Sequence, residues 1–193
     1  MLSLRINVDN YQYYPLEVAG LKRNLPICKV NDDLYIAAFV IFGDVELTKA
    51  CATELIKKMP EFDVLVTAES KGIPLAYEIA RQLGLDNYII ARKTAKLYMK
   101  TPVAVHLHSI TTAHTQTLYL DKSDMDYIKG KRVVIADDVI STGESLSAIE
   151  KLIIQSGGNI VAKMAILVEG DAADRKDIIA LQELPLFIPD NKQ

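Results

Sequence analysis

The segment that decides the fold covers residues 133–145 and reads Val-Val-Ile-Ala-Asp-Asp-Val-Ile-Ser-Thr-Gly-Glu-Ser. Its four apolar residues are too few for a helix and mostly β-branched, so they predict a strand that is buried on both faces. Two carboxylates, Asp137 and Asp138, follow at the expected end of this strand. A turn of small residues and an amphipathic pattern come next. The segment therefore predicts a strand, an acidic tip, an anion-binding loop and a helix that begins near Gly143.

The acidic tip and the loop together suit a phosphorylated sugar. Ligands bind outside the carboxyl ends of parallel strands, which is where the two carboxylates are expected. Adjacent carboxylates can hold sugar hydroxyls, or a Mg²⁺ ion directly or through water. The loop and the positive end of the helix dipole favour an anion such as phosphate. We expect the loop residues of this site to be Ser141, Thr142, Gly143, Glu144 and Ser145.

This segment closely resembles the phosphoribosyl-pyrophosphate signature of type I phosphoribosyltransferases. In that family, the acidic pair holds the ribose hydroxyls and the Thr-Gly turn binds the 5′-phosphate. The alternative is an ordinary buried strand followed by a Ser/Thr/Gly helix cap. The sequence contains neither G-x-x-x-x-G-K-[ST] nor G-x-G-x-x-G, which disfavours a Walker-type nucleotide site and a dinucleotide fold.

A second strand-to-helix loop follows the apolar residues 62–67 and precedes a helical pattern over residues 73–83. In the resembling family this loop binds pyrophosphate, through backbone amides and a basic side chain at the place of Lys71. Read alone, Lys71 is more typical of a solvent-facing lysine beside a tight turn than of an anion site. A third apolar strand, residues 88–91, ends in further cations, and clustered cations in an acidic protein predict a local anion site. The residues assigned to this site are Glu69, Ser70, Lys71, Gly72, Arg92, Lys93 and Lys96.

Strand and helix patterns alternate through the rest of the chain, which predicts an α/β fold with a mainly parallel central sheet flanked by helices. We expect one domain over residues 1–193, in which residues 1–33 form an N-terminal hood or arm. The tyrosines at positions 11, 13 and 14 are typical either of a base-binding surface or of packing. The other expected elements are a helix over 46–58, a hairpin of 103–108 with 115–120, a fourth strand over 131–138 with its helix over 146–153, a fifth strand over 160–168, a short helix over 174–181 and a last strand over 184–188. The resemblance implies that the hairpin is a flexible flap.

Composition limits the classes of partner. The 193 residues are 50% hydrophobic and carry a net charge of −3, which gives no bulk electrostatic case for binding nucleic acid or a membrane surface. No apolar run is long enough to span a bilayer, and the two cysteines show no oxidised or metal-binding pattern. We therefore expect a cytoplasmic protein that binds neither nucleic acid nor membrane.

The resemblance implies Mg²⁺-dependent transfer of ribose 5-phosphate from phosphoribosyl pyrophosphate to a purine base, in a homodimer that serves purine salvage. Asp137, Asp138, Lys71 and Arg92 are the expected catalytic residues, and Asp137 and Asp138 the metal ligands. Phe39 and Phe42 are candidates for the base-binding surface or for core packing.

Relatives that use 6-oxopurines place a lysine shortly after the fifth strand, where this chain has Gly170 and Asp171; this favours adenine. The acidic flap residue of adenine enzymes is not evident between residues 111 and 117, which leaves the base open. The alternatives are a xanthine phosphoribosyltransferase, a non-catalytic regulator that binds phosphoribosyl pyrophosphate like the bacterial purine repressor, a hydrolase or a pyrimidine enzyme. The chain is acidic and offers no stretch for a DNA-binding domain ahead of the core, and both features favour the enzyme over the regulator.

Overall fold

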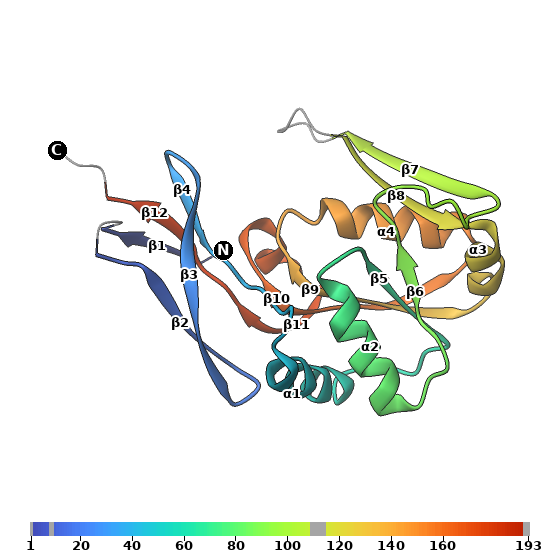
Figure 1. Ribbon diagram of the computed structural model, residues 1–193, viewed down its shortest axis with the longest axis horizontal. Helices are drawn as coiled ribbons and strands as arrows, with labels where there is room; N and C mark the ends of the chain where they lie inside the picture. The colour runs from blue at the N-terminus through green and yellow to red at the C-terminus, as the bar shows by residue number, and fades with distance from the viewer. Residues whose placement is uncertain (1, 8–9, 109–114, 191–193) are drawn as a thin grey trace.

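The computed structural model describes residues 2–7, 10–108 and 115–190. Its core is a parallel five-stranded sheet with the strand order β11-β10-β9-β5-β6. Figure 1 shows this sheet between two layers of helices, with α1 and α2 on one face and α4 on the other. The strands are β5 (Val64–Ala68), β6 (Ile89–Ala91), β9 (Arg132–Ile140), β10 (Asn159–Val168) and β11 (Ile179–Glu183), and the helices are α1 (Val45–Ile56), α2 (Gly72–Leu83), α3 (Lys122–Ile128) and α4 (Glu144–Gln155).

Alternation along β9 explains why the sheet is covered on both faces. Val134 and Ala136 are fully buried in a cluster that includes apolar residues of α1 and α2. Val133 and Ile135 are fully buried in a second cluster with the apolar stripe of α4. Successive strand side chains point to opposite faces, so an uninterrupted apolar run requires a cover on both. The expectation of a parallel α/β sheet flanked by helices is confirmed.

A second, mainly antiparallel sheet lies beside the core, and we call it the hood sheet (Figure 1). Its strand order is β1-β12-β4-β3-β2, so it includes strands from both ends of the chain. Tyr11 and Tyr14 pack against Phe187, with ring centroids 5.9 and 5.5 Å from it, so these two tyrosines serve packing. The strands are β1 (Ser3–Ile6), β2 (Tyr13–Val18), β3 (Leu21–Asn31), β4 (Leu34–Ala37) and β12 (Leu186–Pro189).

A hairpin of β7 (Pro102–His108) and β8 (Thr115–Asp121) lies over α4, as Figure 1 shows. Apolar residues of β8 join the cluster beneath α4; Leu118 and Leu120 are both buried. This hairpin matches the one expected for the flap, while residues 109–114 lie outside the described part of the chain. No described helix combines the length and the hydrophobicity needed to cross a membrane.

Three sequence-based expectations about individual elements were wrong. Residues 174–181 are not a helix: a 3-10 helix, η1 (Gly170–Asp174), precedes β11, because Ile179 and Ala180 pair with β10. The last strand, β12, belongs to the hood sheet, where it pairs with β1 and β4. Strand β9 also continues past the acidic pair to Ile140, because β10 is long enough to pair with it there.

Candidate active site

The loop between β9 and α4 forms a cradle at the carboxyl edge of the sheet. Gly143 precedes α4 with φ 77°, in the left-handed region that favours glycine, and its carbonyl accepts the first hydrogen bond of the helix from Ser147 N at 2.8 Å. The free N–H groups of the first helical turn are therefore directed into the loop. A cavity of about 210 Å³ lies here, lined by Asp137, Val139, Ile140, Ser141, Thr142, Gly143, Glu144, Ser145 and Leu146. All five loop residues expected from the sequence line this cavity.

The two carboxylates of the acidic pair have different surroundings. Asp137 lines the loop cavity, and its Oδ1 accepts a hydrogen bond from Asp138 N at 2.9 Å. Asp138 is only 3% exposed, and its Oδ2 lies 3.2 Å from Lys71 Nζ. Burial, together with the neighbouring charge of Asp138, raises the pKa of Asp137. Such a pair favours bound cations and hydroxyl donors.

Gly72 brings the two strand-to-helix loops into direct contact. A Cβ atom at residue 72 would lie 2.2 Å from Thr67 Oγ1 and 2.7 Å from Asp137 Oδ1. Only glycine leaves room for the end of β5, the start of α2 and the acidic pair of β9 to meet. The topology therefore joins the two predicted anion-binding loops into one site, as their parallel strands require.

The cations of the predicted pyrophosphate site divide into two groups. Lys71 turns toward the acidic pair and the carbonyl oxygen of Phe39, which lies 3.4 Å from its Nζ. Arg92 Nε and Lys96 Nζ instead lie 3.3 and 3.6 Å from the Glu69 carboxylate. The cations therefore face two carboxylates, Asp138 within β9 and Glu69, which directly follows β5.

Glu69 organises the second group. Its carboxylate accepts a hydrogen bond from Lys93 N at 3.0 Å, and this bond is the largest cause of its lowered pKa. Lys93 and Ser70 are both exposed to solvent. Arg92 Nε is buried and has no hydrogen bond to the described residues, although it lies within ion-pair distance of Glu69. The arrangement leaves donors of Arg92 and Lys93 available to an incoming anion.

A second cavity, of about 410 Å³, opens between the hood sheet and the acidic strand. Its lining combines aliphatic residues with three polar ones, and comprises Ile36, Ala37, Ala38, Phe39, Val40, Lys71, Val139, Ser141, Glu169 and Leu184. Phe39 is 4% exposed and lines it, whereas Phe42 is 50% exposed and does not. Of the two aromatic candidates for base binding, only Phe39 lies at a cavity beside the acidic pair.

Glu169 was not among the residues selected from the sequence. It follows β10 directly, is 8% exposed and lines the cavity with Lys71 and Ser141. Burial raises the pKa of Glu169, while the neighbouring Ser141 hydroxyl and the charge of Lys71 oppose that rise. The available signal was a carboxylate at the end of the fifth apolar strand, where a parallel sheet places its ligands.

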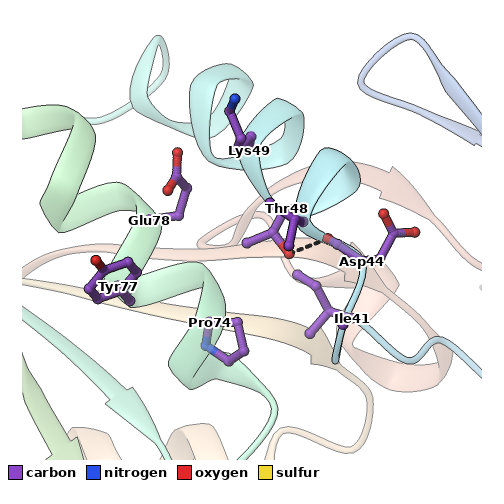
Figure 2. A pocket seen from close by; sticks show the side chains of 9 residues that line it. Ile41, Asp44, Thr48, Lys49, Pro74, Tyr77 and Glu78 are labelled. Atoms are coloured by element: carbon purple, nitrogen blue, oxygen red, sulfur yellow. Dashed lines mark hydrogen bonds between the residues drawn. The ribbon is translucent and has the colours of Figure 1, made fainter.

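A third cavity, of about 200 Å³, lies between α1 and α2 (Figure 2). Several of its polar groups already serve the fold: the Thr48 hydroxyl donates to the Asp44 carbonyl, and Asp44 caps α1 and pairs with Arg23. Glu78 is paired with Arg81. None of the residues predicted for the site lines this cavity, and we assign no chemistry to it.

Residues 46–185 match the model of the phosphoribosyl transferase domain, which is more than half of the chain. The chain belongs to the phosphoribosyl transferase family. It is 33% identical to a hypoxanthine/guanine phosphoribosyltransferase of Methanococcus voltae over 67% of this chain and 66% of that protein. It is 32% identical to an adenine phosphoribosyltransferase of Acetivibrio thermocellus over 66% of this chain and 72% of that protein. The expected membership of the purine group of type I phosphoribosyltransferases, a class of glycosyltransferases, is confirmed.

Two further comparisons extend this result. The chain is 33% identical to the purine biosynthesis transcriptional repressor PurR of Bacillus subtilis, over 60% of this chain but only 39% of that protein. The fold matches the crystal structure of an adenine phosphoribosyltransferase from Thermoanaerobacter pseudethanolicus with a TM-score of 0.63 and 21% identity, over 89% of this chain and 95% of that one. The relatives therefore include both enzymes and a regulator, so the choice between these two functions for this chain depends on the geometry of the site.

Proposed function

We propose that this protein transfers ribose 5-phosphate from phosphoribosyl pyrophosphate to a purine base, with adenine favoured, and releases pyrophosphate. The observation that carries the proposal is the contact at Gly72, which joins the β5–α2 loop, the acidic pair and the phosphate cradle. One ligand with a phosphate at one end, a ribose in the middle and a pyrophosphate at the other end would span these three parts. Phosphoribosyl pyrophosphate has this order of groups.

The residues present fit Mg²⁺. Asp138 Oδ2 is buried and has no hydrogen bond to the described residues beyond its ion pair with Lys71, and Asp137 offers a second carboxylate beside it. Mg²⁺ is commonly bound by one or two carboxylates together with substrate phosphates. Asp137 and Asp138 are therefore the residues that we propose hold it, directly or through water. When bound, Mg²⁺ neutralises charge on the leaving pyrophosphate.

The residues of the chain would act mainly by electrostatics and positioning. The loop cradle binds the 5′-phosphate and fixes the ribose against Asp137 and Asp138, whose charge balances the cationic anomeric carbon. Arg92 would stabilise the departing pyrophosphate from the side of the β5–α2 loop, and Lys71 would exchange its contact with Asp138 for a contact with the ligand. The base would enter the cavity lined by Phe39, where the hood sheet excludes water from the reacting centre.

The preference for adenine rests on the end of β10. Gly170 and Asp171 stand where related 6-oxopurine enzymes carry a lysine, and Glu169 beside them presents a carboxylate, which is unsuited to a 6-oxo group. The test is to compare kcat/KM for adenine, hypoxanthine, guanine and xanthine at saturating phosphoribosyl pyrophosphate. We expect adenine to exceed each 6-oxopurine by about a hundredfold or more. Faster turnover with a 6-oxopurine would contradict this assignment.

A second candidate is a regulator that binds phosphoribosyl pyrophosphate without turnover, and the likeness to the Bacillus repressor favours it. Calorimetric titration with phosphoribosyl pyrophosphate and Mg²⁺, followed by the four-base assay, separates the two. Saturable binding without nucleotide formation from any purine would favour the regulator. We further propose that the protein is a cytoplasmic homodimer that works in purine salvage and binds neither nucleic acid nor membrane.

A further inference from the structure

Within the described part of the chain, three buried polar side-chain atoms have no hydrogen-bond partner, and all three lie at one edge of the core sheet. They are Thr67 Oγ1, Arg92 Nε and Asp138 Oδ2. Thr67 is near the carboxyl end of β5, Arg92 directly follows β6, and Asp138 is near the carboxyl end of β9; these three strands are neighbours. Buried polar groups are almost always paired, so each exception calls for an explanation.

The proposed function accounts for two of these atoms. Asp138 Oδ2 is available to Mg²⁺, and Arg92 lies on the side of the departing pyrophosphate. Thr67 has no role in that account: it is fully buried and is not among the described residues that line the two cavities of the site. Any function of its hydroxyl therefore passes through a neighbouring side chain.

The neighbour that the geometry offers is Asp137. Leu65 packs in the cluster that includes α1 and α2, and strand side chains alternate, so the side chain of Thr67 points toward the same layer. A Cβ atom at residue 72, at the start of α2, would lie 2.2 Å from Thr67 Oγ1 and 2.7 Å from Asp137 Oδ1. The hydroxyl and the carboxylate thus border the space that Gly72 leaves by having no side chain, although no hydrogen bond joins them in this structure.

An unpaired hydroxyl at this position costs stability. A buried donor without an acceptor destabilises a fold, whereas an apolar group of the same shape avoids this cost. The three residues before Thr67 in β5 are apolar, and valine has nearly the shape of threonine. Asp137 Oδ1 accepts one hydrogen bond, from Asp138 N, and a carboxylate oxygen can accept a second. The hydroxyl is therefore explained by a bond that it makes when the site is loaded.

We propose that Thr67 is a positioning residue, which donates its hydroxyl hydrogen to the Asp137 carboxylate when phosphoribosyl pyrophosphate and Mg²⁺ are bound. The bond holds the carboxylate in the direction that the ligand requires. This inference rests on the proposed function, because it takes the ligand of the acidic pair to be the ribose of phosphoribosyl pyrophosphate. Thr67 acts through Asp137 and contacts neither the sugar nor the metal.

The first test is Thr67→Val, which removes the hydroxyl and keeps the volume. Urea denaturation without ligand gives its stability, and calorimetry with phosphoribosyl pyrophosphate and Mg²⁺ gives its affinity without turnover. We expect a urea midpoint at or above that of the wild type, and an affinity about tenfold weaker. A lower midpoint would show that the hydroxyl is already satisfied in the free protein. That result, a failure to fold or an unchanged affinity would overturn the proposal.

Thr67→Ser provides a rescue, because it keeps the hydroxyl and removes only a methyl group. We expect its affinity to stay within about threefold of the wild type, while its urea midpoint falls because of the small cavity. The two variants should therefore change stability and affinity in opposite directions, which a role in packing alone would not produce. Binding by Thr67→Ser that is as weak as binding by Thr67→Val would contradict the role of the hydroxyl.

The matched control is Thr48→Val. Thr48 is also buried, but its hydroxyl donates to the Asp44 carbonyl at 2.7 Å in α1, away from the acidic pair. Removal of this satisfied hydroxyl should lower the urea midpoint and leave the affinity for phosphoribosyl pyrophosphate unchanged. A loss of affinity in this control equal to that of Thr67→Val would show that the effect is not specific to Thr67.

A double-mutant cycle tests the route through Asp137. In the Asp137→Ala protein the bond has no acceptor, so the addition of Thr67→Val should weaken binding no further. Independent losses that multiply in the double variant would remove Thr67 alone from the account. If the wild-type protein does not bind phosphoribosyl pyrophosphate with Mg²⁺, the proposed function fails and this inference fails with it.

Discussion

Gly72 and Asp137 lie so close that a Cβ atom at residue 72 would be 2.7 Å from Asp137 Oδ1 and 3.4 Å from Asp137 Cα. This contact joins the start of α2 to the acidic pair of β9. It fixes the distance between the two loops that we assign to pyrophosphate and to ribose 5-phosphate. A substitution at this glycine should therefore affect the site and the fold together.

Replacement of Gly72 by Ala should lower the free energy of unfolding by about 1–3 kcal/mol, as expected for an overpacked buried position. Urea denaturation measures this change. The partner variant Thr67→Ala/Gly72→Ala should recover part of the loss, because Thr67 Oγ1 is the atom nearest to the added Cβ, at 2.2 Å. A Gly72→Ala protein as stable and as active as the wild type would contradict the close packing.

Replacement of Gly143 by Ala should weaken binding of ribose 5-phosphate, since the cradle needs the left-handed backbone at this residue. Gly157 provides a matched control, because it has the same φ of 77° just beyond the other end of α4. Both variants should lose about 1–2 kcal/mol of stability from backbone strain. Only Gly143→Ala should also lose affinity by tenfold or more, and equal affinities in the two variants would refute the cradle assignment.

The sequence was sufficient for the parts of the site that depend on local pattern. The run from Val133 to Ser145 predicts a buried strand, two carboxylates and a glycine turn, and the structure has all three, although the strand continues past the carboxylates to Ile140. The β5–α2 loop follows the same rule. Parallel strands then place both loops at one edge of the sheet without further information.

Features that depend on contacts between distant segments were missed. Residues 174–181 carry charges beside an apolar run, and only pairing with β10 makes residues 179–183 a strand. The split of the cations arises because Lys71 meets Asp138 while Arg92 and Lys96 meet Glu69. The spacing of these residues along the chain predicts neither the pairing of residues 179–183 with β10 nor the carboxylate with which each cation pairs.

Replacement of Asp138 by Asn should reduce kcat by about a hundredfold or more, because the side chain keeps its shape but loses the charge that faces the reacting ribose. The unfolding midpoint should change little by comparison, since Lys71 is partly exposed and can turn to solvent. Asp63→Asn is the control: it removes a carboxylate paired with Arg132 at the surface. This control should retain full activity, and a loss of activity in proportion to stability in both variants would contradict a chemical role for Asp138.

The acid side of the stability profile should depend on Glu78. The hydrogen bond from Arg81 lowers the pKa of this carboxyl to about 2 from its ordinary value of 4.5. The unfolded chain therefore binds more protons between these two values, so the contribution of Glu78 is present above pH 4.5 and is lost as the pH falls toward 2. Glu78→Gln should flatten the rise of the urea midpoint between pH 2 and 4.5, and an unchanged slope would count against this pairing.

The most direct test of the central claim follows the products of phosphoribosyl pyrophosphate, Mg²⁺ and adenine by phosphorus NMR. The account predicts adenosine monophosphate and pyrophosphate in equal amounts, and no formation of ribose 5-phosphate while adenine remains. Release of pyrophosphate with ribose 5-phosphate would show a hydrolase. Binding of phosphoribosyl pyrophosphate without any product, from adenine or another purine, would contradict the account and leave a regulator.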